Sequence, residues 1–172
     1  MYLQSPVFKL PEVFAYFRSF VQLYIPNTLH SKYSSSHGCW LPHLQCVLTL
    51  CDLLLKYHDS ELYRHISEKE VTFQTFGTSW LMTLFTRVVD FTLVYELFEI
   101  LLFQGDELFP LFLPIALLVR NREAVLRCLD LETVIVQLQR NIKVSTAKEL
   151  ADLYFEAVRV RSNTPVSFAI LV

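Results

Sequence analysis

Hydrophobic positions recur at intervals of three and four residues over most of this chain, which is the period of one face of an α-helix. After Asp90 the spacing holds for six apolar residues: Leu93, Val94, Leu97, Phe98, Leu101 and Leu102. Gly105 suits the left-handed position that ends a helix, and Asp106-Glu107 would start the next helix with acidic charge at its N-terminus. The stretch 80–119 therefore predicts a buried helical hairpin, around which we expect the rest of the chain to pack.

Three further helices are predicted in the first 66 residues. Pro11-Glu12 opens one of them with proline in the tolerated first turn, and Pro26 ends it. Residues 27–38 are polar and rich in serine, so we expect an exposed loop there. An apolar stripe then predicts a helix over 41–58, and Asp59 can cap a short helix over the following sequence SELYRHI.

Start signals also mark the remaining helices. Thr72 can begin a brief helix that leads into Trp80, and Asp130 can cap a helix with Leu131, Val134, Ile135 and Leu138 facing inward. Thr146 and Glu149 have the spacing of a capping box, in which each side chain accepts a bond from the other residue's backbone N–H. We expect an all-α protein of roughly eight helices and essentially no strands.

Composition supports this fold class and restricts the function. The chain has 172 residues, of which 53% are hydrophobic, including 14 Phe, and only 3 Gly. So few glycines argue against a sandwich, a Rossmann fold or a phosphate-binding loop. The net charge is −2 with no basic block, so neither nucleic-acid binding nor an anionic membrane surface is favoured.

The cysteines and the longest apolar run bear on location. There are 4 Cys without a Cys-x-x-Cys pair, and no N-terminal signal pattern, which favours reduced thiols in a cytoplasmic protein. The longest apolar run, Leu108–Val119, contains Pro110 and Pro114 and is far shorter than the ~20 residues of a spanning helix. We therefore expect no transmembrane segment, with peripheral membrane association left open.

The metal-capable side chains cluster at one place only. His37, Cys39, His43 and Cys46 lie within ten positions of one another. Their spacing is loose, because zinc sites usually use tight pairs such as Cys-x2-Cys. We therefore predict no metal and no cofactor, and interpret this stretch as a loop that leads into an apolar helix.

Three other groups of residues could suggest catalysis. In Tyr57-His58-Asp59 the carboxylate could orient the imidazole, but Asp59 as a helix cap explains the same residues. Glu96 and Glu99 could be paired carboxylates, yet apolar neighbours favour the flank of an amphipathic helix. Arg87 could be an arginine finger that reaches a phosphate, but a lone arginine after an aromatic run is usually a surface residue. No catalytic, cofactor-binding or metal-binding residue is predicted.

Residues 46–119 resemble the C-terminal half of a TBC domain, the all-helical fold of Rab GTPase-activating proteins. The similar segments, in family order, are LLLKYHDSEL at 53–62, Val71, Trp80-Leu81, Leu84-Phe85, Val94, Gly105-Asp106, Phe109 and IALL at 115–118. The family's Trp-Asp pair is Phe98-Glu99 here, a change that keeps an aromatic ring and a carboxylate. The resemblance extends over about 13–168 and implies that 1–172 is a partial TBC domain with exposed apolar surface, so we expect poor solubility or self-association.

The same resemblance sets expectations for activity. Catalytic family members use an arginine from an Ile-x-x-Asp-x-x-Arg motif and a glutamine from a Tyr-x-Gln motif to stabilise the γ-phosphate and orient water. Both motifs belong to the N-terminal half of the domain, so we expect this sequence to begin downstream of them and to contain neither motif. We therefore expect a non-catalytic fragment of a vesicle-trafficking adaptor, with golgin-type tethers, vesicle adaptors or a Rab GTPase as partners at the Golgi and endosomes. The alternative is the C-terminal half of an active Rab GTPase-activating protein.

Overall fold

The computed structural model describes residues 11–12, 14–15, 17–18, 42–106 and 108–171. The chain divides into two compact units, Met1–Leu44 and Gln45–Val172. In the first unit the described residues between Pro11 and Arg18 are helical, which confirms that part of the predicted first helix, and Phe14 and Phe17 are exposed there. The predicted loop over 27–38 lies outside the described residues.

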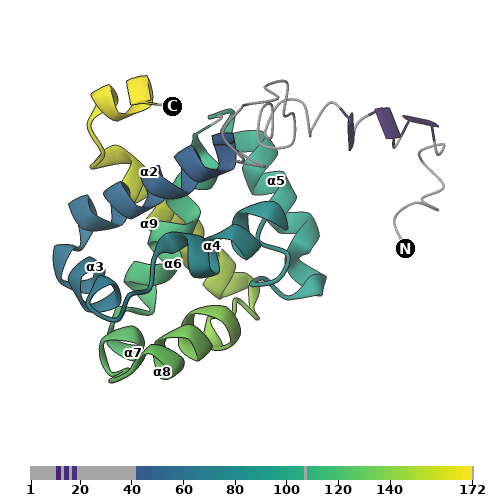
Figure 1. Cartoon of the computed structure of the whole chain (residues 1–172). Coiled ribbons are helices and arrows are strands. Elements are labelled where there is room, and N and C mark those ends of the chain that lie inside the picture. Colours follow the sequence, from purple (N-terminus) through teal and green to yellow (C-terminus); the bar gives the residue numbers. More distant parts are fainter. Residues whose placement is uncertain (1–10, 13, 16, 19–41, 107, 172) are drawn as a thin grey trace. The chain divides into compact units, whose positions relative to one another are not determined.

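Helices make up the described part of the second unit, in agreement with the predicted all-α class (Figure 1). The α-helices are α2 (Pro42–His58), α3 (Ser60–Ser67), α4 (Phe73–Met82), α5 (Val94–Gln104), α6 (Phe112–Arg120), α7 (Arg122–Leu126), α8 (Leu131–Val136) and α9 (Ala147–Ser162). Short 3-10 turns occur at η2 (Phe91–Leu93), η3 (Phe109–Leu111) and η5 (Val166–Leu171), and η4 (Gln137–Asn141) is π-helical. Within the described ranges, β pairing is limited to one isolated parallel bridge between Val89 and Val144.

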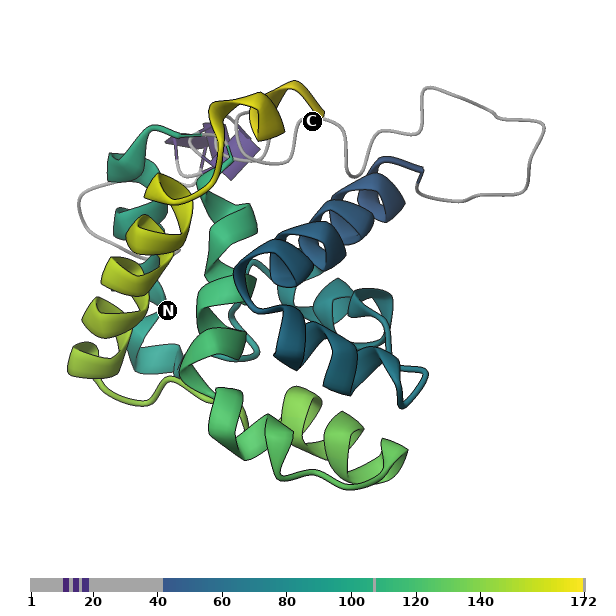
Figure 2. The same cartoon turned by 90° about the vertical axis from the view of Figure 1, so that its left-hand side faces the viewer.

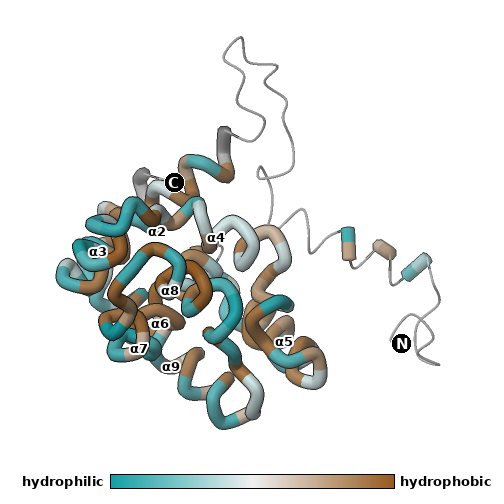
Figure 3. The backbone as a smooth tube through the Cα atoms, turned by 60° about the horizontal axis from the view of Figure 1, so that its bottom comes forward, coloured by the Kyte–Doolittle hydropathy of each residue, from teal (hydrophilic) through white to brown (hydrophobic). Residues whose placement is uncertain are grey.

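The core of the second unit is built around α6. Every residue of this helix from Phe112 to Leu118 is buried, as predicted for the second arm of the hairpin. In Figure 2, α6 runs between α9 on one side and α2 on the other. The side of α9 that packs inward carries Leu150, Leu153, Ala157 and Val160. Figure 3 shows the hydropathy of these helices: α5 and α6 are mostly hydrophobic, whereas hydrophobic and hydrophilic residues alternate along α3.

A second part of the core is an aromatic cluster within α4. The Phe73 ring centroid lies 4.7 Å from that of Phe76 and 6.4 Å from that of Trp80, and all three side chains are buried. Gly77 faces the Phe73 ring, and a Cβ atom at this position would lie 2.1 Å from ring carbons of Phe73. The glycine therefore gives the phenylalanine its space.

The predicted caps are confirmed in detail. Asp59 accepts a hydrogen bond from the Leu62 N–H at 2.9 Å, and Thr146 and Glu149 form the expected capping box. Gly105 adopts φ 63° at the end of α5, the left-handed conformation that glycine accepts without a steric penalty. Asp90 does cap its element, but the capped turn is the 3-10 turn η2, and α5 begins only at Val94.

Two apolar side chains predicted to face inward are exposed. Leu102 is 51% exposed and Leu131 is 48% exposed. On α5 the buried stripe is narrower than the pattern suggested, since Leu93, Leu97 and Leu101 are buried and Leu102 lies about 100° further around the helix. Leu131 is the first residue of α8, and burial within that helix is confined to Val134, so this stripe is also narrower than predicted.

No helix in the described part of the chain combines the length and apolar character needed to cross a membrane.

Candidate functional site

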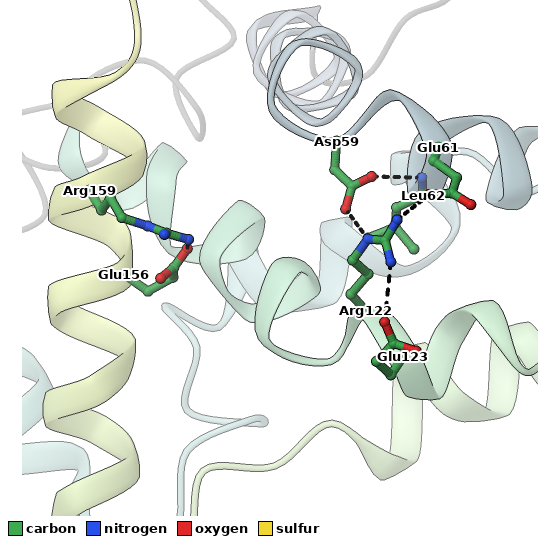
Figure 4. Close-up of polar contacts among 7 residues, drawn as sticks. All are labelled: Asp59, Glu61, Leu62, Arg122, Glu123, Glu156 and Arg159. Atoms are coloured by element: carbon green, nitrogen blue, oxygen red, sulfur yellow. Dashed lines mark hydrogen bonds and ion pairs between the residues drawn. The ribbon is translucent and has the colours of Figure 1, made fainter.

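The most concentrated group of charges in the described residues surrounds Arg122, the first residue of α7 (Figure 4). Its Nε donates to Asp59 Oδ2 at 2.8 Å, and one Nη donates to Glu61. The other Nη donates to Glu123 Oε1 at 3.2 Å. Three carboxylates therefore share one guanidinium, and two of them come from the start of α3.

Asp59 has two roles in this cluster. One of its oxygens caps α3 through the Leu62 N–H, while the other binds Arg122. The side chain of Asp59 is only 12% exposed, so the pair is partly shielded from solvent. Asp59 raises the pKa of Arg122, mainly through its hydrogen bond and secondly through the attraction of its charge. Arg122 is thus a permanently charged tie between α3 and α7.

This arrangement determines what Arg122 can do chemically. An arginine that acts on a phosphate must offer its N–H groups to an anion in the transition state. The N–H groups of Arg122 are already occupied by carboxylates, and the cluster carries an excess of negative charge, which would repel a phosphate. We interpret the cluster as structural.

A second arginine ties the C-terminal end of α9 to the hairpin. Arg161 donates from Nε to Asp106 Oδ2 at 2.8 Å, and its guanidinium lies 5.4 Å from the centroid of the Phe112 ring. Asp106 also accepts from the Leu108 N–H at 2.9 Å. The predicted role of Asp106 at the restart of the helix is therefore combined with an ion pair that sequence spacing did not reveal.

His58 is not paired with Asp59. Its Nε2 lies 2.8 Å from the Thr164 hydroxyl oxygen, and that hydroxyl donates to the Val160 carbonyl. Nε2 therefore carries the proton in this contact, and burial lowers the pKa of His58. The imidazole joins the ends of α2 and α9, and the hydroxyl that it contacts is buried and gives its proton to a backbone carbonyl, so that hydroxyl is not poised as a nucleophile. Asp59 caps α3 instead, which confirms the helix-cap interpretation.

The carboxylates of α5 and the arginine after the aromatic run lie apart from these ties. Glu96 is exposed and Glu99 is half-buried on α5, in agreement with the flank of an amphipathic helix. Arg87 lies exposed in the turn that follows α4, where its carbonyl accepts a bond from the Lys143 ammonium. The structure does not bring Glu96, Glu99 and Arg87 together with the Arg122 cluster through any recorded contact.

The cluster considered for metal binding falls mainly outside the described residues. His37 and Cys39 are not described, nor is the side chain of His43, and Cys46 is exposed. Elsewhere in the described residues, no three potential ligands gather at one point. Cys46, Cys51 and Cys128 are free thiols, and burial raises the pKa of Cys51, which makes that thiol unreactive.

Comparison with known proteins establishes the family. Residues 5–126 match the Rab-GTPase-TBC domain, and the chain belongs to this family. Its relatives include the TBC domain-containing protein kinase-like protein of Homo sapiens, 28% identical over 105 residues, which are 60% of this chain and 11% of the relative. The Dictyostelium discoideum protein of the same description is 23% identical over 96% of this chain and 15% of its own length. TBC1 domain family member 4 of Mus musculus is 28% identical over 59% of this chain and 8% of its length. The chain thus matches only a small part of these relatives.

The expectation about the finger motifs needs one correction from the sequence itself. No Ile-x-x-Asp-x-x-Arg segment occurs in the 172 residues, but a Tyr-x-Gln string does occur at Tyr2-Leu3-Gln4. It precedes the first residue of the family match and lies outside the described residues. Sequence reasoning also missed Arg122, which no sequence pattern had singled out.

Proposed function

We propose that the chain is a TBC module that binds Rab GTPases or tethering proteins without accelerating GTP hydrolysis. One observation carries the proposal, namely the absence of an Ile-x-x-Asp-x-x-Arg segment from the sequence. An arginine finger contributes about 10³–10⁵ to the rate of GTP hydrolysis, because it neutralises charge that develops on the transferred phosphate. A module without that arginine loses catalysis while its binding surfaces remain.

The cellular setting of the proposal is vesicle traffic between endosomes and the trans-Golgi network. The segments YHDSEL at 57–62, VTFQTFGTSW at 71–80 and SNTPVSF at 162–168 are similar to TBC domain family member 23. That protein is regarded as an adaptor without finger residues that links golgins to endosome-derived vesicles. By this similarity the chain would be cytoplasmic and peripheral to Golgi and endosomal membranes, with golgin-type tethers and vesicle adaptors as partners.

A phosphate-release assay with a panel of GTP-loaded Rab GTPases tests the catalytic half of the proposal. We expect the purified chain to leave each intrinsic hydrolysis rate unchanged, even in molar excess. Binding is measured in parallel by calorimetry against the same GTPases and against golgin segments. Faster GTP hydrolysis by any Rab GTPase in the presence of the chain would contradict the proposal.

The alternative is part of an active GTPase-activating protein, and the Tyr2-Leu3-Gln4 string is the observation that favours it. Should hydrolysis be accelerated, the variant Gln4→Ala separates the two explanations of that activity. Loss of acceleration in Gln4→Ala would identify Gln4 as the glutamine that orients water. Unchanged acceleration would place the catalytic groups elsewhere.

A further inference from the structure

Three cations gather where the turn after α4 meets the extended segment before α9. The Asp90 N–H donates to the Val144 carbonyl at 2.8 Å, and the Val144 N–H donates to the Val88 carbonyl at 2.9 Å. These bonds place Arg87 beside Lys143, whose ammonium donates to the Arg87 carbonyl. Arg140, in η4, precedes Lys143 by three positions, so its backbone lies near the same segment. The sequence shows no block of basic residues here, because Arg87 and Lys143 are 56 positions apart.

The backbone that carries Arg87 is held in an unusual conformation. Leu84 and Phe85 both have positive φ, at 48° and 63°, in the left-handed region that residues other than glycine usually avoid. Phe85 is 1% exposed, and its N–H donates to the Trp80 carbonyl at 2.8 Å. Burial and hydrogen bonding therefore fix this turn, so Arg87 stands on a preorganised support.

Most of the other arginines form ion pairs, whereas these three cations form none within the described residues. Arg64, Arg120, Arg122, Arg159 and Arg161 each bind a carboxylate. Arg87, Arg140 and Lys143 are exposed and bind none. Electrostatic attraction at this surface is thus available to a partner.

Two carboxylates lie near the group, and both are engaged by backbone N–H groups. Asp90 accepts from the Thr92 N–H at 2.9 Å, and Glu149 accepts from the Ser145 N–H at 2.7 Å. Arg87, Arg140 and Lys143 outnumber these two carboxylates, in a chain whose net charge is −2.

A large apolar side chain lies beside the cations. Phe91 is 77% exposed and directly follows Asp90, whose N–H donates to the Val144 carbonyl. An exposed aromatic ring next to unpaired lysine and arginine suits a membrane interface, where the ring enters the headgroup layer and the cations meet anionic lipids. An acidic protein segment without apolar residues would engage the cations but leave the exposed ring in water.

We propose that Arg87, Phe91, Arg140 and Lys143 form a surface that binds anionic phospholipid membranes. The proposal is independent of the proposed function, because a catalytic and a non-catalytic TBC module would use such a surface alike.

The test is co-sedimentation of the full chain with phosphatidylcholine vesicles with and without about 20% phosphatidylserine. We expect binding only to the anionic vesicles, with a steep decline as salt is added. The double variant Arg87→Gln/Arg140→Gln should bind about 25-fold more weakly, since each cation near an anionic leaflet contributes ~1 kcal/mol, or about fivefold. Phe91→Ser should also weaken binding.

The matched control is Arg64→Gln/Arg159→Gln, which removes the same charge from two arginines that are 70% and 65% exposed elsewhere on the surface. It should bind anionic vesicles as the unmodified chain does, and thermal unfolding of all variants verifies that they fold. Equal loss in both double variants, or no binding by the unmodified chain, overturns the proposal. Full binding by Phe91→Ser, or binding to poly-glutamate without vesicle binding, overturns the membrane as the partner.

Discussion

Replacing Gly77 with alanine is expected to destabilise the protein, although the same change usually stabilises a helix. An alanine Cβ would lie 2.1 Å from Cδ1 and Cε1 of Phe73. Phe73 is 1% exposed and packs against Phe76 and Trp80, so its ring has no free space to enter. Overpacking of a core costs about 1–3 kcal/mol, and the gain in helix propensity from glycine to alanine is about 1 kcal/mol.

Because an overlap of this size requires the ring to move by more than an ångström, we expect the steric cost to exceed the propensity gain by about 1–2 kcal/mol. For a chain of this length that corresponds to a decrease in Tm of roughly 3–6 °C. Thermal and urea unfolding followed by far-UV circular dichroism measure it. Thr75→Ala, an exposed position of the same helix, is the control and should change the stability by less than about 0.5 kcal/mol.

A double-mutant cycle isolates the contact that the prediction depends on. In a Phe73→Leu background the ring is gone, so Gly77→Ala should be neutral or stabilising, with a coupling of about 1–2 kcal/mol between the two positions. A Gly77→Ala single variant that is more stable than the original chain would refute the reasoning. So would an equal loss in both backgrounds, which would trace the effect to something other than the Phe73 ring.

Three further predictions concern titratable groups and ion pairs. Asp52 accepts a hydrogen bond from the first N–H of α4, so Asp52→Ala should lower the free energy of urea unfolding by about 1 kcal/mol. Burial raises the pKa of the Asp52 carboxyl group, which means that the folded state binds the carboxyl proton more tightly than the unfolded state does. The stability advantage of Asp52→Asn over the original chain should therefore grow as the pH rises through that pKa. Arg122→Met should lower stability by leaving Asp59 and its neighbouring carboxylates without their cation, with a smaller effect at high salt. His58, whose pKa burial lowers, should titrate by NMR below the ordinary histidine value, so that acidification through that value destabilises the fold.

Local signals were sufficient for most of the helical architecture. Caps such as Asp59, Gly105 and the Thr146 box depend on side chains within three residues of the helix end, and sequence spacing therefore predicts them well. The apolar run over 108–119, too short to span a membrane, also indicated the buried helix α6. The errors at Leu102 and Leu131 have one physical origin, because periodicity gives the direction of an apolar stripe but not its width, which depends on what the neighbouring helices cover.

The long-range features of the candidate sites could not be predicted in this way. Arg122 meets carboxylates about sixty positions earlier, and Arg87 meets Lys143 56 positions later. Nothing in the local sequence of either arginine distinguishes the ion-paired one from the unpaired one. The left-handed pair Leu84-Phe85 was likewise unpredictable, since both residues normally avoid that region and adopt it here because buried contacts fix the turn.

The surroundings of the arginines also limit where a catalytic finger could come from. A finger must exchange water for phosphate oxygens, and an arginine already bound to carboxylates would have to leave them and expose their charges to an anion. Arg122 and Arg161 are bound in this way to buried or half-buried partners. Arg87 is unpaired, but it stands on the strained turn and not in an Ile-x-x-Asp-x-x-Arg segment. If a Rab bound to this module does hydrolyse GTP faster, we expect the arginine responsible to be neither Arg122 nor Arg161 but one supplied by another molecule, since no Ile-x-x-Asp-x-x-Arg segment occurs in the sequence. An assay in which hydrolysis is restored only when that second component is added would support this reasoning, and acceleration by the chain alone that persists in Arg87→Gln and Gln4→Ala would contradict it.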